Sequence, residues 1–173
     1  CIRDSVTLVN ASVSVEPPMF VDVVNVTSAA DMADVVKSKA AEQDIIIMTA
    51  AVADFCPSHP ADEKIKKNDS SYESVIELER TEDILSYLGA HKAKGQLICG
   101  FSMETQNMLE NSKAKLAKKN ADMIVANNLK VAGAGFGTDT NVVTLITADD
   151  CTELEIMDKS CVAARIMDRL LQM

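Results

Sequence analysis

The sequence predicts an α/β fold with a mainly parallel central sheet and an antiparallel hairpin extension. Short apolar runs alternate with stretches of helical periodicity, which is typical of parallel strands joined by helices. Two apolar runs near the C-terminus follow each other closely, which indicates the hairpin. With 173 residues, the chain is predicted to form a single domain over residues 1–173.

The first third of the chain predicts strands and one helix. Strands are expected at residues 6–10, 21–26 and 44–48. The third run is fully apolar, as in a strand buried on both faces of a parallel sheet. Before it, Thr27 and Ser28 are expected to cap a helix that ends near Ala41.

The middle of the chain predicts a long loop and then shorter elements. Residues 50–69 read as a loop with two prolines and several lysines, and loops of this length are commonly functional. Residues 74–79 alternate as an antiparallel or edge strand would. Thr81, followed by Glu82 and Asp83, is expected to open a short helix that ends at Gly89.

The second half repeats the alternation of strands and helices. Strands are expected at residues 96–101 and 122–126, with a helix at 105–119 between them. A hairpin around Asp149 and Asp150 joins strands expected at residues 142–147 and 153–157. The last helix, residues 158–173, places three apolar side chains on one face, namely Val162, Ile166 and Leu170.

The charge balance excludes two classes of partner. Asp and Glu total 26 against 17 Lys and Arg, which gives a net charge of −9. A surface this acidic repels duplex nucleic acid and anionic membranes, so neither is expected to bind. No apolar run approaches the roughly 20 residues of a membrane-spanning helix.

The five cysteines are widely spaced and odd in number, which predicts unpaired thiols in a reducing cytoplasm. A nucleophilic thiol is a weaker alternative, with Cys56 served by His59 three residues later. With only two histidines in the chain, no metal-ligand cluster is predicted.

The lysines are concentrated in two windows of an acidic chain, which are Lys64, Lys66 and Lys67, then Lys113, Lys115, Lys118 and Lys119. Lys115 and Lys119 share a helix face, where like charges repel unless an anion lies between them. Two interpretations stay open, a pocket for a polyphosphate or a solvated helix face and loop.

Ligands of parallel sheets bind beyond the carboxyl ends of the strands. Three segments are therefore expected to line the site, residues 49–54, 100–105 and 126–129. Asp54 and Phe101 within them have two readings each, a ligand contact or an ordinary loop or core residue. The glycines of residues 133–137 precede a strand rather than a helix, so they predict a turn and not a dinucleotide site.

Several segments occur together in one order. They are Ala-Ala-Val-Ala-Asp-Phe at 50–55, Glu-Lys-Ile-Lys-Lys at 63–67, Gly-Phe at 100–101 with Glu-Thr at 104–105, Lys115 and Lys119, Ala-Asn at 126–127, and Gly-Phe at 135–136 with Asp139 and Asn141. This set resembles the phosphopantothenate–cysteine ligase family, and the resemblance covers nearly the whole chain. It implies a Rossmann-like three-layer fold and a ligase that joins 4′-phosphopantothenate to cysteine with CTP and Mg²⁺, through an acyl-cytidylate.

The resemblance also implies roles for individual residues. Lys64 matches a catalytic lysine on a mobile flap. Nucleotide contacts are implied for Asp54, which would read the cytosine edge, and for Lys64, Phe101, Lys115, Lys119, Thr81, Glu82, Asp83 and Ile84. The substrate pocket is expected to include Ala50, Ala51 and Asn127.

The chain departs from the family pattern at two motifs and at its start. Thr81-Glu82-Asp83-Ile84 replaces the usual Asn-Pro-Asp-Ile, and Gly-Phe-Ser-Met at 100–103 replaces Gly-Phe-Ala-Ala. A Gly-rich N-terminal segment of the family is not matched, so the domain is expected to be N-terminally incomplete. A non-catalytic nucleotide-binding or assembly module of the same fold is therefore the alternative, and an unrelated flavin- or NAD-binding protein is a third. The family further implies a homodimer and a flavin-dependent decarboxylase half, fused or associated.

Overall fold

The computed structural model describes residues 5–11, 13, 15–61, 63–64, 75–104, 107–128 and 137–173. The chain divides into two compact units. The first unit comprises Cys1–Val36 and Ala51–Asp83, and the second comprises Lys37–Ala50 and Ile84–Met173.

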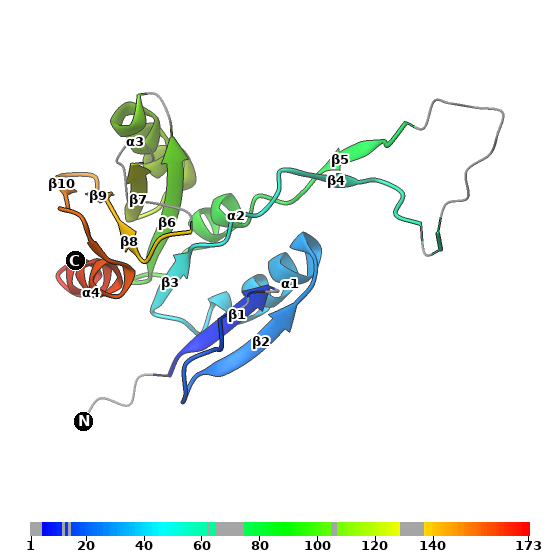
Figure 1. Cartoon of the computed structure of the whole chain (residues 1–173), viewed down its shortest axis with the longest axis horizontal. Coiled ribbons are helices and arrows are strands. Elements are labelled where there is room, and N and C mark those ends of the chain that lie inside the picture. The colour runs from blue at the N-terminus through cyan, green and yellow to red at the C-terminus, as the bar shows by residue number, and fades with distance from the viewer. Residues whose placement is uncertain are drawn as a thin grey trace. The chain divides into compact units, whose positions relative to one another are not determined.

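The first unit contains a pair of parallel strands followed by a capped helix (Figure 1). The elements are β1 (Thr7–Ala11), β2 (Asp22–Val26) and the start of α1 (Ala29–Ala40). The Asp31 backbone N–H donates to Ser28 Oγ over 3.0 Å, and the Ser28 N–H donates to Asp31 Oδ2 over 2.9 Å. This reciprocal pair is a capping box, which confirms the predicted start of the helix.

A short antiparallel ribbon also belongs to the first unit, formed by β4 (Phe55–Pro57) and β5 (Leu78–Arg80) (Figure 1). The prediction of a loop over residues 50–69 was therefore wrong at β4. The strand expected at 74–79 was displaced toward Arg80, and residue 74 lies outside the described residues. A three-residue strand gives no periodicity of its own, and here it is defined by pairing with a segment more than 20 residues away.

The second unit is built on a five-stranded sheet in the order β10-β9-β7-β6-β3. Its strands are β3 (Ile45–Met48), β6 (Leu97–Glu104), β7 (Met123–Asn128), β9 (Val143–Ile146) and β10 (Cys151–Glu153). The first three are parallel, and β9 and β10 extend the sheet with antiparallel pairings. The predicted fold class is thus confirmed.

Helices cover both faces of this sheet, which gives the second unit three layers (Figure 1). On one face α4 (Lys159–Leu170) packs against a core of Cys99, Met123, Val125, Val143, Leu145, Val162, Ile166 and Leu170. This confirms the apolar face predicted for the last helix. The other face is covered by α2 (Ile84–Ala90) and α3 (Met108–Lys119).

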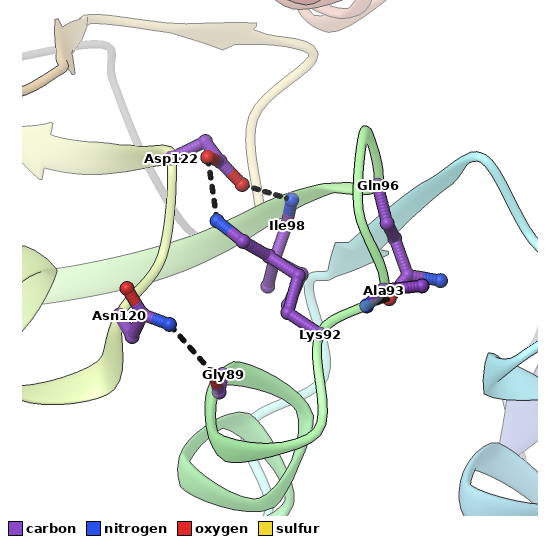
Figure 2. Close-up of polar contacts among 7 residues, drawn as sticks. All are labelled: Gly89, Lys92, Ala93, Gln96, Ile98, Asn120 and Asp122. Carbon is purple, nitrogen blue, oxygen red and sulfur yellow. Dashed lines mark hydrogen bonds and ion pairs between the residues drawn. The ribbon is translucent and has the colours of Figure 1, made fainter.

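Polar contacts lock α2 and α3 to the amino ends of β6 and β7 (Figure 2). The Asn120 Nδ2 donates to the Gly89 carbonyl oxygen over 2.7 Å. Asp122 accepts two hydrogen bonds, one from Lys92 Nζ over 2.8 Å and one from the Ile98 backbone N–H over 2.7 Å. A carboxylate with two donors at a partly buried site fixes the register of the two strands.

A buried glutamine fastens the segment before the sheet to β6. Gln96 Nε2 donates to the carbonyl oxygens of Ala40 and Gln43, over 2.7 and 2.6 Å. Its Oε1 accepts from the Ala93 backbone N–H over 3.3 Å (Figure 2). The sequence reading missed this anchor, since Gln96 reads there only as the start of a strand.

Three expectations about boundaries need correction. β3 ends the described sheet and is half-buried along its length, so it is not fully buried as its apolar sequence suggested. The hairpin turn is tightened by the Thr147 N–H, which donates to the Asp150 carbonyl over 2.9 Å, so the return strand is β10 rather than residues 153–157. Met157–Asp158 instead forms β11, which pairs with β8 (Thr140–Asn141).

Two helix starts also differ from expectation. The helix expected at Thr81 begins at Ile84, because the Thr81 hydroxyl donates to the Ala53 carbonyl rather than capping a helix. The helix expected from 105 begins at Met108, after Asn107 adopts a left-handed backbone with φ 48°. Among the described residues, no helix is both long and apolar enough to cross a membrane.

Candidate functional site

The carboxyl ends of β3, β6 and β7 lie at one edge of the sheet in the second unit, because the three strands are parallel. Met103 pairs with Asn127 in the register of β6 and β7, and Glu104 pairs with Asn128. Two of the segments predicted to line the site therefore lie side by side. Residues 105 and 129 of these segments lie outside the described residues.

The two predicted phosphate-binding lysines are held by their neighbours. Lys115 Nζ donates to the Phe101 carbonyl oxygen over 2.8 Å, which ties α3 to β6. Lys119 Nζ donates to Ser86 Oγ on α2 over 2.9 Å. Both side chains are half-buried, so neither matches a solvated helix face. An ammonium group has three donors, and the contact with Phe101 uses one of those of Lys115.

A buried pair of hydroxyl groups fixes the position of α3 on β6. Ser102 Oγ on β6 and Ser112 Oγ on α3 lie 2.8 Å apart, and the residues are 4% and 0% exposed. A hydrogen bond in so dry a place fixes how α3 sits on the strand, and so where Lys115 lies. The sequence reading noted Ser102 only as a departure from the family pattern and missed this contact.

Phe101 is half-buried and packs against the core on the α4 face. The core alternative for this ring is therefore supported by its packing. The predicted contact with a nucleotide stays a prediction for its exposed part.

Asn127 of the predicted substrate pocket is half-buried and paired with Asn141 on β8. The Asn141 Nδ2 donates to Asn127 Oδ1 over 2.9 Å. The two amides thus connect the carboxyl end of β7 to β8, a contact that the sequence motifs did not predict.

Another predicted set lies in the first unit. The Thr81 N–H donates to the Asp54 carbonyl oxygen over 3.0 Å, and the Thr81 hydroxyl donates to Ala53. The structure therefore brings together two predicted nucleotide-binding segments, the one around Asp54 and the turn at Thr81. The Asp54, Glu82 and Asp83 residues are exposed, whereas Ile84, in the second unit, is buried at the start of α2.

Lys64, Ala50 and Ala51 are exposed in the structure. Lys64 belongs to the first unit, beyond the β4 strand, and its neighbours Lys66 and Lys67 lie outside the described residues. The site assignments of these three exposed residues stay predictions.

Cys56 and His59, the proposed nucleophile and its base, each lie near a glutamate. His59 lies 3.9 Å from Glu77, and the Cys56 thiol is 3.9 Å from Glu79 Oε1. Burial, with a smaller contribution from Asp122, raises the pKa of the Cys99 thiol to about 12, which keeps it protonated. Cys56, Cys99, Cys151 and Cys161 are free thiols, and Cys1 lies outside the described residues.

Comparisons with known proteins agree with this architecture. The model of the DNA/pantothenate metabolism flavoprotein C-terminal domain matches residues 3–173. The coenzyme A biosynthesis bifunctional protein CoaBC of Bacillus subtilis (strain 168) is 45% identical over 167 residues, which cover 95% of this chain and 40% of that protein. A cysteine/cysteine sulfinic acid decarboxylase of an unknown prokaryotic organism is 44% identical, over 96% of this chain and 46% of its own length.

Among solved structures, the C-terminal domain of CoaBC matches with a TM-score of 0.78 at 40% identity, over 97% of this chain and 75% of that one. The chain spans less than half the length of the two curated relatives described above. The family model, by contrast, covers almost the whole chain. The chain therefore belongs to the family of DNA/pantothenate metabolism flavoprotein C-terminal domains.

Proposed function

We propose that this domain is a ligase that joins 4′-phosphopantothenate to cysteine, with CTP as the activating nucleotide. The observation that carries the proposal is the pair of half-buried lysines on α3, Lys115 and Lys119, in a domain related to CoaBC. Two cations held four residues apart on one helix face suit a polyphosphate ligand, which relieves their mutual repulsion.

The proposed reaction has two steps. A carboxylate oxygen of 4′-phosphopantothenate forms a bond to the α-phosphorus of CTP, and the bond to pyrophosphate breaks. The amine nitrogen of cysteine then bonds to the acyl carbon, CMP leaves with the shared oxygen, and the amine loses a proton. Both steps need charge stabilisation at phosphate oxygens more than an acid–base pair.

The lysines of this chain would supply that stabilisation. Lys115 and Lys119 would hold the triphosphate, and the family resemblance gives Lys64 a catalytic role. Mg²⁺ usually binds substrate phosphates together with a few carboxylates and waters, so it would arrive with the nucleotide and neutralise further charge. Asp54 would accept a hydrogen bond from the amino group of cytosine. Thr81 supports that loop through its two hydrogen bonds to Ala53 and Asp54.

A homodimer, a flavin-dependent decarboxylase half and a cytoplasmic location are part of the same proposal. The full-length relatives described as bifunctional CoaBC support a second half, since the matched region is 40% of the Bacillus subtilis protein. The free thiols of the described cysteines suit a reducing compartment.

One observation favours a second candidate, a nucleotide-binding or assembly module that does no chemistry. A relative that is 44% identical to this chain bears the name of a decarboxylase, so a similar domain occurs in a protein named for another reaction.

Two measurements separate the candidates. A thermal-shift titration compares CTP, ATP and GTP, each with Mg²⁺. A ligand at about 100 times its Kd adds roughly 2.7 kcal/mol to stability. A shift with CTP alone supports both the ligase and the module. Release of pyrophosphate from CTP that depends on added 4′-phosphopantothenate then supports the ligase, and CTP binding without that release supports the module. No shift with any nucleotide and no pyrophosphate release would reject both.

A further inference from the structure

The hydrogen bond between Asn127 and Asn141 defines which carboxamide donates and which accepts. Asn141 Nδ2 donates to Asn127 Oδ1 over 2.9 Å, and both residues are half-buried. A carboxamide has an accepting side and a donating side, so the order of the two groups decides what Asn127 presents beyond the pair.

The backbone fixes this order. The Val142 N–H donates to Asn141 Oδ1 over 2.9 Å. A backbone N–H can only donate, so the oxygen of Asn141 must face it and the Nδ2 must face Asn127. The Asn127 oxygen is then occupied by Asn141. The Asn127 Nδ2, with its two hydrogens, lies on the opposite side of that carboxamide.

Asn141 is well placed to hold this orientation, because it is tied down on several sides. It pairs with Met157 in the β8–β11 ladder. The Asn128 N–H donates to the Val142 carbonyl over 3.0 Å, and the Lys159 N–H donates to the Asp139 carbonyl over 2.9 Å. The backbone on both sides of Asn141 is therefore held by hydrogen bonds, which limits the movement of its side chain.

Asn127 itself occupies the edge where a parallel sheet binds its ligands. It is the last residue but one of β7, and it pairs with Met103 on β6 and with Val143 on β9. A directed donor at this edge suits a ligand oxygen that accepts hydrogen bonds, such as a carboxylate or amide carbonyl.

We propose that Asn141 is a positioning residue that makes Asn127 a hydrogen-bond donor to an acceptor oxygen of the acid substrate. This inference rests on the proposed ligase function, in which the acid is 4′-phosphopantothenate. Asn141 acts through Asn127 and does not touch the substrate.

The test compares two substitutions of Asn141. If Asn141 orients Asn127, the conservative change to aspartate should weaken substrate binding more than the change to alanine. In Asn141→Asp, one carboxylate oxygen still accepts from Val142, and the other accepts from Asn127 Nδ2. Asn127 must then turn over and present its oxygen to the substrate. In Asn141→Ala nothing directs Asn127, which can still offer its Nδ2 part of the time.

We expect Asn141→Asp to raise the Kd and the KM for 4′-phosphopantothenate about 10-fold or more, and Asn141→Ala to raise them about 3-fold. The Kd for 4′-phosphopantothenate is measured by calorimetry without nucleotide. This measurement reports binding of the acid even for a variant that has no measurable turnover. The KM for CTP and the melting temperature should change little in Asn141→Asp. Gln172→Glu, an exposed amide-to-acid change in the same unit, is the matched control.

Other causes predict other results. A purely structural role predicts that Asn141→Ala is the worse variant, since alanine loses both hydrogen bonds, whereas aspartate still accepts from Val142 and from the turned Asn127. Simple repulsion between the new charge and the substrate predicts that 0.5 M salt restores binding, because salt at this concentration shortens the range of electrostatic interactions to a few ångströms. Either result overturns the inference and leaves the ligase proposal standing. If the unaltered protein neither binds 4′-phosphopantothenate nor forms product, both proposals fail.

Discussion

Lys115 Nζ lies 2.8 Å from the carbonyl oxygen of Phe101, so a charged group on α3 is bonded to the backbone of β6. Phe101 lies three residues before the end of β6, within the segment 100–105 that the sequence assigns to the site. The contact holds the ammonium group beside β6 before any ligand arrives. Preorganised charge of this kind is more effective than a lysine that must be ordered on binding.

Replacing Lys115 by methionine tests the charge and spares most of the side-chain volume. We expect Lys115→Met to lower kcat/KM for CTP roughly 100-fold, as for the loss of one transition-state donor. The melting temperature should fall by no more than a few degrees. The matched control is Lys118→Met, an exposed lysine on the same helix, which should keep near-normal kcat/KM. Equal losses in the two variants would show that Lys115 has no special role.

Lys64 lies in an exposed segment of the first unit, so its removal should cost activity and not stability. We expect Lys64→Ala to reduce the rate of acyl-cytidylate formation about 100-fold, measured as pyrophosphate release with saturating CTP. The melting temperature should be unchanged. Lys94→Ala, at another exposed position, serves as the control. A matching drop in melting temperature and rate would assign Lys64 to the fold instead.

Asp54 is the proposed reader of the base. The carboxylate accepts hydrogen bonds only, and an asparagine amide can both donate and accept. We therefore expect Asp54→Asn to narrow the ratio of kcat/KM for CTP over other nucleotides by about 10-fold. Glu42→Gln removes an exposed carboxylate elsewhere and should leave the ratio intact. Unchanged selectivity in Asp54→Asn would mean that another group reads the base.

The sequence predicted those parts of the fold that repeat a local pattern. The face of α4 made by Val162, Ile166 and Leu170 follows from helical spacing, and the Thr27-Ser28 cap follows from a short motif. Local rules could not predict contacts between distant segments. The Thr81 hydroxyl donates to the carbonyl of Ala53, which lies 28 residues away in the sequence. Because of this contact, α2 starts later than the sequence predicted.

The same division applies to the site. Lys115, Lys119 and Asn127 were found because their residue types and positions after strands suit ligand binding. Their partners were missed, since Ser86, Phe101 and Asn141 are supplied by other elements. The Ser102–Ser112 pair joins a strand to a helix and depends on how these pack. Spacing along one element carries no trace of such a contact.

The capping box of α1 predicts a stability change at acidic pH. Hydrogen bonds from Ser28, and then from Thr27, hold the pKa of Asp31 below its ordinary value of 3.8. A lowered folded-state pKa means that the stabilisation is present above pH 3.8 and is lost as the pH falls through the folded value.

The measurement is the difference in melting temperature between the unaltered protein and Asp31→Ala. We expect a clear difference at pH 7 and pH 5 and a smaller one at pH 3. Asp168→Ala removes an exposed carboxylate on α4 and should give little difference at any of these pH values. A difference for Asp31→Ala that stays constant down to pH 3 would rule out a role for the charge.

Gly89 on α2 lies against the C-terminal end of α3, and its replacement tests how α3 is held. A Cβ atom at Gly89 would lie 1.8 Å from the Lys119 carbonyl oxygen, which is backbone and cannot rotate away. At Gly100 the nearest atom to an added Cβ is Leu85 Cδ2 at 2.7 Å, the end of a flexible side chain. The two glycines are therefore a matched pair.

We expect Gly89→Ala to lower stability by about 3 kcal/mol, or roughly 6–12 °C in melting temperature, and Gly100→Ala by about 1 kcal/mol. Since α3 carries Lys115 and Lys119, the shift that relieves the clash at Gly89 must also move the proposed phosphate-binding lysines. We therefore expect Gly89→Ala to lose ligase activity even when it is assayed at a temperature well below its melting temperature, where the protein is still folded. Gly100→Ala should lose far less activity under the same conditions. Equal stabilities for the two variants, by thermal melting, would show that α2 and α3 can separate without consequence.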